Sequence, residues 1–469
     1  MRIHFIAIGG SAMHNLAIAL HQKGYVITGS DDEIFEPSKS RLAGYGLLPE
    51  QEGWDPDRIS PDLDAVILGM HARENNPELQ RARELGLKIF SYPEFLYEQT
   101  RNKTRVVIGG SHGKTTITSM IMHVLRENHI AFDYMVGAQL EGFETMVGLS
   151  ESAQIAVFEG DEYLSSPTDR RPKFHLYHPH IAVLSGIAWD HINVFPTFEG
   201  YVEQFRIFAR LIEPGGTLCY YDEDPLLREI AAEQHHIRTE GYNIHPYITE
   251  DHTTYLKAGE REIRLKIFGE HNLQNISAAQ SVCLALGVTN EQFYRAIRTF
   301  SGAARRLEVL SANDQTTVFR DFAHSPSKLQ ATTRAVKQQF PGRRLVACME
   351  LHTFSSLKKE FLPHYNQCME EADLAFVYYN PHTVEHKKLE PITPEMISAG
   401  FQKRGLQVLT DSGELFDHLE KMDWKEANLL LMSSGNFDGK DLPAFALKIT
   451  GDPVKFQRGD WIRNPQGKL

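Results

Sequence analysis

The chain has 469 residues, more than one hydrophobic core organises, and this length predicts about three domains. Hydrophobic residues make up 42% and charged residues 23%, as in folded globular proteins, and the formal net charge of -12 argues against a general binder of nucleic acid or anionic membranes. The four cysteines form no CxxC pair or disulfide framework, and no apolar run reaches the roughly 20 residues that span a bilayer. We therefore expect a cytoplasmic protein with no nucleic-acid partner and no membrane insertion.

The first hundred residues follow a strand, glycine turn and helix pattern. An apolar run at residues 3–8 predicts a buried strand, and apolar residues then recur at helical spacing after a glycine turn. Further strands are predicted at 25–28 and 65–68, the second followed by a polar loop. This pattern predicts a Rossmann-like domain over residues 1–100.

The N-terminal turn, Gly9-Gly10-Ser11, lacks the outer glycines of a full dinucleotide motif, so it is a weak nicotinamide site. Such a turn can also receive the pyrophosphate of another nucleotide, with Asp31 near the ribose or base. We include His71, in the loop after the third strand, among the candidate ligand-binding residues. A purely structural turn is the alternative.

The strand and helix pattern starts again at residue 105. Strands are predicted at 106–108, 155–158 and 181–184, and a later helix begins near residue 272. This second region predicts a central P-loop ATP-binding domain over residues 101–302.

The loop between the strand at 106–108 and the next helix reads GGSHGKTT over 109–116. Its glycines let backbone N–H groups turn toward phosphates, Lys114 can neutralise phosphate oxygens, and the Thr115 hydroxyl can bind Mg²⁺. The sequence matches the shorter GxxGKT form, because Ile108 stands where the longer motif has glycine. The predicted ATP-binding residues of the loop are Gly110, His112, Gly113, Lys114, Thr115 and Thr116.

Two groups beyond this loop are predicted to hold Mg²⁺ with Thr115. Glu159 follows the strand at 155–158, where a carboxylate can approach the triphosphate. His191 follows the next strand. The alternatives are a solvated acidic turn for Glu159 and a structural hydrogen bond for His191, since a lone histidine more often serves that purpose.

The last part of the chain alternates strands and helices once more. The predicted strands lie at 317–319, 345–349, 374–378, 406–409 and 429–432. Alternation of this kind implies a mostly parallel sheet with ligand sites at the carboxyl ends of its strands. We therefore predict a Rossmann-like C-terminal domain over residues 303–469, and for the whole chain an α/β fold with three mostly parallel sheets.

Charged residues near the start of this third region are candidates for ligand contacts. Arg306 follows a stretch of small residues and can bring a cation to phosphates when domains close, although a surface ion pair is an equal alternative. Asp321 and His324 lie in a loop after the first strand, where residues that face a cleft are expected.

Taken together, these motifs resemble the Mur ligase family over essentially the whole chain. The resemblance implies ATP and Mg²⁺ as cofactors, with Lys114, Glu159, His191 and Arg306 as the catalytic group. It also implies that the segment 269–275, GEHNLQN, contacts adenine through Asn272 and Asn275, and that Arg306 and Asp321 lie near the nucleotide. The family's nucleotide-sugar site corresponds to Gly9, Gly10, Ser11, Asp31 and His71.

Within the family, Glu162-Tyr163 and the segments 170–174, 305–308 and 432–437 look most like the members that join UDP-N-acetylmuramate to the tripeptide L-alanyl-γ-D-glutamyl-meso-diaminopimelate in peptidoglycan recycling. Two positions depart from that pattern: the usual EADE is EGDE at 159–162, and Ser325 replaces a second histidine. The acceptor is therefore open between the tripeptide and free L-alanine. Residues that can line its pocket are His324, His352, Asn380 and His382.

The resemblance implies that ATP converts a lactyl carboxylate to an acyl phosphate, which an amine then attacks. Closure of the domains, with hinges near residues 99–104 and 301–304, would keep water from that intermediate. Two alternatives belong to other classes: a catalytically silent UDP-sugar sensor and a nicotinamide-dependent oxidoreductase. The intact phosphate loop argues against both.

Overall fold

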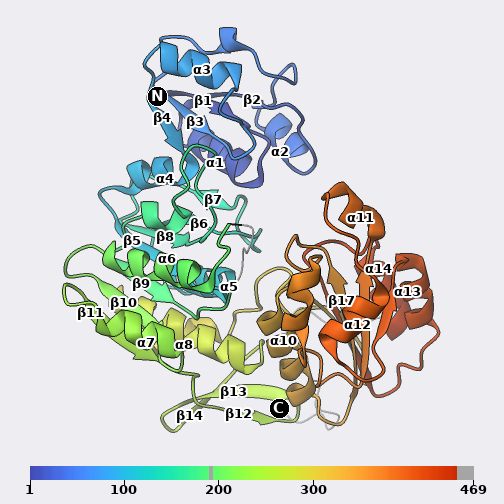
Figure 1. Cartoon of the computed structure of the whole chain (residues 1–469). Helices are drawn as coiled ribbons and strands as arrows, with labels where there is room; N and C mark the ends of the chain where they lie inside the picture. The colour runs from blue at the N-terminus through green and yellow to red at the C-terminus, as the bar shows by residue number, and fades with distance from the viewer. Residues whose placement is uncertain (190–193, 452–469) are drawn as a thin grey trace. The chain divides into compact units, whose positions relative to one another are not determined.

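The computed structural model describes residues 1–189 and 194–451 (Figure 1). The chain has a three-domain α/β fold whose sheets are mostly parallel. It divides into two compact units, the first formed by Met1–Ile187, Pro196–Asn243 and Ala278–Phe293 and the second by the remainder. The predicted fold class is confirmed, whereas the predicted boundaries at residues 100 and 302 stay predictions.

The N-terminal sheet has the strand order β2-β1-β3-β4, with all neighbours parallel. Its strands are β1 (Arg2–Ile6), β2 (Val26–Ser30), β3 (Ala65–Leu68) and β4 (Ile89–Ser91), and its helices are α1 (Ser11–Gln22), α2 (Ser38–Gly44), α3 (Pro77–Glu84) and α4 (Tyr92–Thr100). Local chemistry fixes the helix starts: Asn76 caps α3, and a capping box of Ser91 and Glu94 begins α4. Because β1 and β3 are parallel neighbours, the loops that follow them lie at one edge of the sheet.

The central sheet has the order β11-β10-β9-β5-β8-β6-β7, parallel except for β6 and β7. Its strands are β5 (Thr104–Gly109), β6 (Phe132–Met135), β7 (Val147–Gly148), β8 (Ile155–Glu159), β9 (Ile181–Leu184), β10 (Thr217–Tyr221) and β11 (Arg238–Tyr242). Helices of this part of the chain are α5 (Lys114–Glu127), α6 (Phe198–Arg210), α7 (Pro225–Ala232), α8 (Glu270–Ala285) and α9 (Asn290–Ile297). Ile108 of β5 pairs with Glu159 of β8, so the loop after β5 begins beside the last residue of β8.

The second unit contains two sheets. A three-stranded antiparallel sheet is formed by β12 (Tyr247–Glu250), β13 (Thr253–Ala258) and β14 (Arg261–Arg264). The six-stranded sheet, in the order β15-β16-β20-β17-β18-β19, contains β15 (Glu308–Ala312), β16 (Thr316–Asp321), β17 (Arg344–Leu351), β18 (Leu374–Tyr379), β19 (Gln407–Leu409) and β20 (Ala427–Met432). Only its β15–β16 pair is antiparallel.

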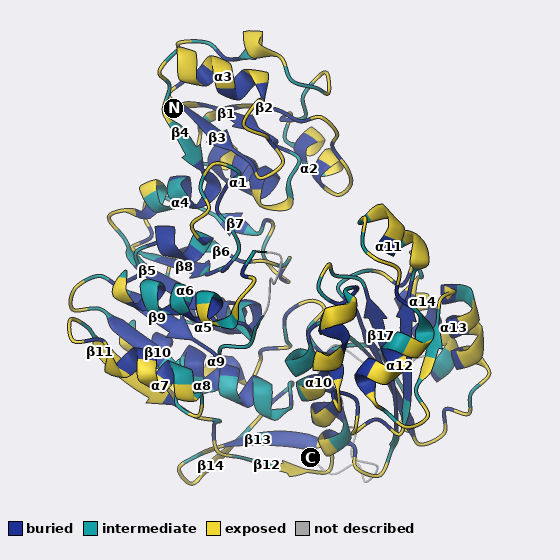
Figure 2. Cartoon of the chain, viewed as in Figure 1, coloured by how far each residue is buried: buried dark blue, intermediate teal, exposed yellow. Residues whose placement is uncertain are grey.

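Helices cover both faces of the six-stranded sheet, and its strands are buried (Figure 2). The helices are α10 (Pro326–Gln339), α11 (Pro381–His386), α12 (Pro394–Phe401), α13 (Ser412–Glu420) and α14 (Leu442–Thr450). Ala347 of β17 packs into the core on the α10 side, and its neighbour Cys348 packs into the core on the α13 side. This alternation explains why the strands read as continuous apolar runs.

The four cysteines, Cys219, Cys283, Cys348 and Cys368, are free thiols buried in the domains. Burial raises the pKa of Cys219 to about 12 and that of Cys368 to about 11. Within the described ranges, the helices are too short or too polar to traverse a lipid bilayer.

Candidate functional site

The predicted phosphate loop connects β5 to α5. Gly110 has φ +123° and Gly113 has φ +74°, so both occupy the left-handed region that favours glycine. A side chain at Gly110 would also collide with Ser185 after β9. The loop therefore brings backbone N–H groups to the N-terminus of α5, where the helix dipole favours an anion.

Lys114, the first residue of α5, is held by two oxygen atoms. Its Nζ donates to the Gly110 carbonyl at 2.7 Å and to Glu162 Oε2 at 2.7 Å. Burial by itself lowers the pKa of Lys114, but the nearby carboxylates of Glu162, Asp161 and Glu159 outweigh this effect and raise the pKa above its usual value. Lys114 is thus positively charged, and its ammonium group lies against the phosphate loop at the Gly110 carbonyl.

The carboxylate of Glu162 is itself buried and depends on neighbours for hydrogen bonds. The Tyr201 hydroxyl, from α6, donates to Glu162 Oε1 at 3.1 Å and lies 2.9 Å from Ser111 Oγ. Because the Tyr201 proton goes to the carboxylate, Ser111 is the donor in the second bond. Sequence reasoning missed Tyr201, since it belongs to an apolar helical stripe that indicates core packing.

Thr115 and Glu159 form the predicted metal-binding pair. Thr115 Oγ1 donates to Glu159 Oε1 at 2.9 Å, and the Gly137 N–H donates to Glu159 Oε2 at 2.7 Å. Hydroxyl and carboxylate oxygens suit Mg²⁺, which usually takes one or two protein oxygens together with substrate phosphates and water. His191 lies outside the described residues, and within them no cluster of three His, Cys, Asp or Glu side chains forms a closed metal site.

All five residues predicted for nucleotide-sugar binding line one pocket of the N-terminal domain: Gly9, Gly10, Ser11, Asp31 and His71. Asp31 Oδ2 accepts the Gly9 N–H at 2.7 Å, which fixes the carboxylate against the turn. Burial is the main cause that raises the pKa of Asp31 to about 6. The exposed Phe35 ring and Trp54 add apolar surface to the same pocket, which the sequence did not indicate.

Among the predicted residues of the second unit, Asp321 is buried at the end of β16. Its two carboxylate oxygens accept the N–H groups of Leu307, at 2.5 Å, and Ala323, at 2.6 Å. Burial raises the pKa of Asp321, although the positive charge of Arg306 opposes this rise. The Arg306 guanidinium lies 4.6 Å from the centre of the Phe322 ring.

Three more predicted residues of this unit have local contacts or are buried. The Asn272 amide donates to the Phe268 carbonyl at 2.8 Å, and Asn275 is also buried on α8. His324 Nδ1 lies 2.9 Å from the Phe322 carbonyl. Their roles toward a nucleotide or acceptor stay predictions.

The remaining predicted acceptor residues follow β17 and β18: His352 is in the loop after β17, Asn380 caps α11, and His382 lies on α11. His352 Nδ1 lies 3.8 Å from Glu350 Oε1, and Asn380 donates to Asp438 Oδ1 at 3.2 Å. Glu350 is buried, and its Oε2 accepts the Phe437 N–H at 2.9 Å and the Ser433 hydroxyl. His382 differs, because its side chain is 92% exposed and its Nδ1 lies 3.9 Å from Glu385 Oε2.

Glu350 is a residue that sequence reasoning missed. It directly follows the strand predicted at 345–349, so an acid at the carboxyl end of a strand was the signal available.

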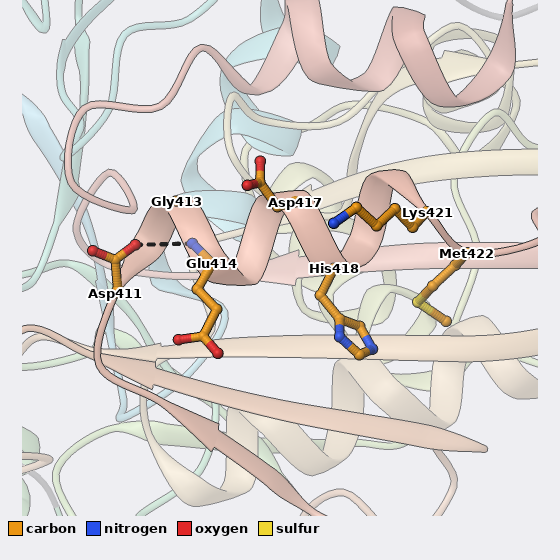
Figure 3. A pocket seen from close by; sticks show the side chains of 7 residues that line it. All are labelled: Asp411, Gly413, Glu414, Asp417, His418, Lys421 and Met422. Carbon is orange, nitrogen blue, oxygen red and sulfur yellow. Dashed lines mark hydrogen bonds between the residues drawn. The ribbon is translucent and has the colours of Figure 1, made fainter.

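A further pocket lies along the surface of α13 (Figure 3). Its side chains belong mainly to the helix itself, and Asp411 accepts the Glu414 N–H at 2.8 Å as the helix cap. None of the predicted site residues lines this pocket, so it is not a candidate site for the reaction.

The loop between β5 and α5 and the Thr115–Glu159 pair beside it have the geometry of a phosphate-binding site in an ATP-dependent enzyme. Three family models match the chain: the Mur ligase family catalytic domain over residues 2–104, the Mur ligase middle domain over 108–283 and the Mur ligase glutamate ligase domain over 305–435. The chain belongs to the Mur ligase family and is an ATP-dependent ligase that forms a C–N bond.

Relatives with two different acceptors are similar to this chain. A UDP-N-acetylmuramate–L-alanine ligase of Limosilactobacillus reuteri is 31% identical over 80% of this chain and 84% of its own. The UDP-N-acetylmuramate–L-alanyl-γ-D-glutamyl-meso-2,6-diaminoheptandioate ligase of Escherichia coli is 30% identical over 75% of this chain and 79% of its own. A crystal structure of a murein peptide ligase from Psychrobacter arcticus, 23% identical, shares the fold with a TM-score of 0.66, over 96% of this chain and 99% of that one.

Proposed function

We propose that this ligase joins UDP-N-acetylmuramate to the tripeptide L-alanyl-γ-D-glutamyl-meso-diaminopimelate. The observation that carries the choice of acceptor is the exposed surface where the loop after β17 meets the end of α11 and an aromatic ring lies beside a lysine. Phe354 is 48% exposed there, and Lys387 Nζ lies 4.3 Å from the centre of its ring. His352 belongs to the loop after β17, and the exposed His382 lies on α11.

The chemistry of the two acceptors supports this choice. The tripeptide has three carboxylates and an extended backbone, whereas L-alanine has one carboxylate and a methyl group. A small acceptor needs a small enclosed pocket, and a long anionic acceptor is better served by a wide surface with positive side chains. Free L-alanine is the second candidate, favoured by the L-alanine ligases at 31% identity.

In the proposed reaction, a carboxylate oxygen of the muramate attacks the γ-phosphorus of ATP, and ADP leaves. The amine nitrogen of the acceptor then attacks the carbonyl carbon of the acyl phosphate, phosphate leaves, and the amide forms as the nitrogen loses its proton. Lys114, held by Glu162 and the Gly110 carbonyl, would contribute positive charge along the phosphate loop. Two of its three N–H donors are already oriented, which leaves one for a phosphate oxygen.

Thr115 and Glu159 are the residues proposed to hold Mg²⁺, with His191 as a further ligand. When bound, Mg²⁺ supplies neutralisation of charge on the transferring phosphoryl group. The hydrogen bond between Thr115 and Glu159 keeps their two oxygens together at 2.9 Å before any ligand arrives. In the N-terminal pocket, the Asp31 carboxylate is proposed to accept hydrogen bonds from hydroxyl groups of the nucleotide sugar.

Phosphate release tests this function. Purified protein is supplied with ATP, Mg²⁺ and UDP-N-acetylmuramate, and release is compared with the tripeptide and with L-alanine, using Lys114→Ala as the control. Release that depends on the tripeptide and is abolished in the variant is the expected result. Release with L-alanine alone would establish the second candidate, and no release with either acceptor would contradict both and favour a nucleotide-sugar sensor.

A further inference from the structure

A short loop of the central domain is attached at one end to Glu159 and at the other to the N-terminal domain. We define the bridging loop as residues 137–146, which join β6 to β7. The N–H of Gly137 donates to Glu159 Oε2 at 2.7 Å, and the N–H of Met146 donates to Asn15 Oδ1 at 2.9 Å. Asn15 lies on α1, directly after the glycine turn of the N-terminal pocket.

Asn15 is fully buried and belongs to a chain of hydrogen bonds that ends at that pocket. Its Nδ2 donates to the Ser11 carbonyl at 2.8 Å and lies 3.0 Å from His14 Nε2. His14 Nδ1 lies 2.9 Å from the Gly10 carbonyl and 3.0 Å from Ser38 Oγ. Gly10, Ser11 and Ser38 all line the pocket.

The direction of these bonds follows from the donors and acceptors. The Gly10 carbonyl can only accept, so His14 Nδ1 carries the proton and His14 Nε2 accepts from the Asn15 amide. This order fixes the Asn15 amide with its oxygen toward Met146. Burial lowers the pKa of His14, which favours the neutral ring that the arrangement requires.

A buried histidine and asparagine inside an otherwise apolar helix face are costly unless each polar atom is paired. If these positions only had to fill the core, aliphatic side chains would be sufficient, as α1 has at Leu16, Ile18 and Leu20. The polar pair instead connects the wall of the pocket to the neighbouring domain. A polar pair with a purely structural role in the core would bond within its own domain, whereas Asn15 also bonds to Met146 of the central domain.

The bridging loop has a second set of contacts with the N-terminal domain, and these are exposed. The Glu144 carboxylate accepts hydrogen bonds from the Tyr45 hydroxyl and from Gln22 Nε2, the latter at 3.3 Å. The backbone carbonyl of Glu144 accepts a hydrogen bond from the Arg41 guanidinium at 2.7 Å. Exposed bonds of this kind contribute little because water competes for both partners. The Asn15–Met146 bond is shielded from water on the Asn15 side and is therefore the stronger constraint on the loop.

We propose that Asn15 is a positioning residue that couples the two nucleotide sites of the first unit. A ligand in the N-terminal pocket restrains the positions of Gly10 and Ser38. The hydrogen bonds of His14 and Asn15 then restrain the bridging loop at Met146. The loop then holds Glu159 beside Thr115, so binding of the nucleotide sugar strengthens binding of ATP with its divalent cation. The inference rests on the proposed function for the identity of the first ligand.

The test measures coupling between two ligands by calorimetry on the full chain. The dissociation constant of AMP-PNP with Mg²⁺ is determined with and without saturating UDP-N-acetylmuramate. We expect the sugar nucleotide to tighten AMP-PNP binding at least about fivefold in the wild type, and, since coupling is reciprocal, AMP-PNP to tighten sugar-nucleotide binding by the same factor. In Asn15→Ala the factor should fall below about two, while each ligand alone binds within about threefold of the wild type.

Asn128→Ala is the matched control, because Asn128 makes the same 2.8 Å amide bond to a carbonyl four residues earlier, at the end of α5. It should keep the wild-type coupling factor. Equal coupling in wild type and Asn15→Ala would overturn the inference, as would a factor of one in the wild type.

Hydrogen exchange of the wild-type chain gives a readout that does not depend on how well a variant folds. Exchange of the Met146 and Gly137 amides should slow at least about fivefold when UDP-N-acetylmuramate binds. Unchanged exchange at both amides would overturn the inference. Failure of phosphate release with normal coupling would count against the proposed ligation alone, so the two failures are distinguishable.

Discussion

Lys114 and Glu162 form a buried ion pair, with Nζ and Oε2 separated by 2.7 Å and the carboxylate 1% exposed. A phosphate-binding lysine that is already paired gives up part of its attraction for ATP. In exchange, it is held in one orientation without help from the ligand. The ion pair therefore favours a fixed orientation of Lys114 over the highest affinity for ATP.

Replacing Glu162 with glutamine tests this reading. Glu162→Gln keeps the size of the side chain but removes its charge, so Lys114 loses its orientation and regains its full attraction for phosphate. We expect kcat to fall about tenfold to a hundredfold, with the KM for ATP unchanged or lower. The matched variant Asp161→Asn, at a carboxylate that pairs with Lys173 at 2.5 Å, should lower kcat by less than about threefold. A raised KM with normal kcat in Glu162→Gln would contradict the positioning role.

Two fully buried tyrosines of the central domain should differ in how much stability is lost when their hydroxyl groups are removed. The Tyr201 hydroxyl bonds to Glu162 and Ser111, whereas the Tyr177 hydroxyl has no hydrogen-bond partner among the described residues. Tyr201→Phe should lower the free energy of unfolding by about 1–3 kcal/mol, because a buried carboxylate loses a donor. Tyr177→Phe should lie within about 0.5 kcal/mol of wild type or be more stable. Urea denaturation measures both, and equal losses would refute the assignment.

Thr115 and Thr118 offer a matched pair for the metal site. Both are buried on α5, but Thr115 bonds to Glu159 whereas the Thr118 hydroxyl has no partner among the described residues. Thr115→Val should raise the Mg²⁺ concentration for half-maximal activity at least about tenfold, since a hydroxyl ligand is lost. Thr118→Val should leave the Mg²⁺ titration unchanged. Identical titrations of the two variants would remove Thr115 from the metal site.

Binding of the nucleotide sugar should depend on pH through Asp31. Its pKa is raised to about 6, mainly by burial, so the carboxyl becomes protonated as the pH falls below that value. A ligand that donates hydroxyl hydrogens to the carboxylate binds the ionised form, and its dissociation constant should therefore rise toward about tenfold per pH unit below pH 6. Calorimetry between pH 5 and 8 measures this. Asp31→Asn should bind more weakly at pH 8 and show a flat profile, and a sloping profile in that variant would assign the dependence to another group.

The sequence predicted strands well where they are apolar throughout. The runs at 65–68 and 181–184 coincide with β3 and β9, because central parallel strands are buried on both faces. The antiparallel sheet β12–β14 was not predicted, since its residues alternate between polar and apolar and carry several charges. No single apolar run marks such a sheet.

The site residues that were predicted from the sequence belong to local motifs, whereas Tyr201, which was missed, does not. Lys114 and Thr115 were predicted because their motif is contiguous and every residue in it has a phosphate-related task. Glu159 was predicted because it ends a strand that pairs with the strand before the loop. Tyr201 could not be, since only the packing of α6 against the loop brings a residue so distant in sequence to Glu162.

The buried cysteines have a practical consequence. Their thiols are enclosed, and the raised pKa values leave almost no thiolate at neutral pH, so native residues should react slowly with maleimides. If one cysteine were introduced at an exposed position in each unit, these two cysteines would be the dominant labelling sites in an otherwise unmodified chain. The protein is thus directly suited to fluorescence energy transfer between its two units, the experiment that would test the predicted domain closure during turnover.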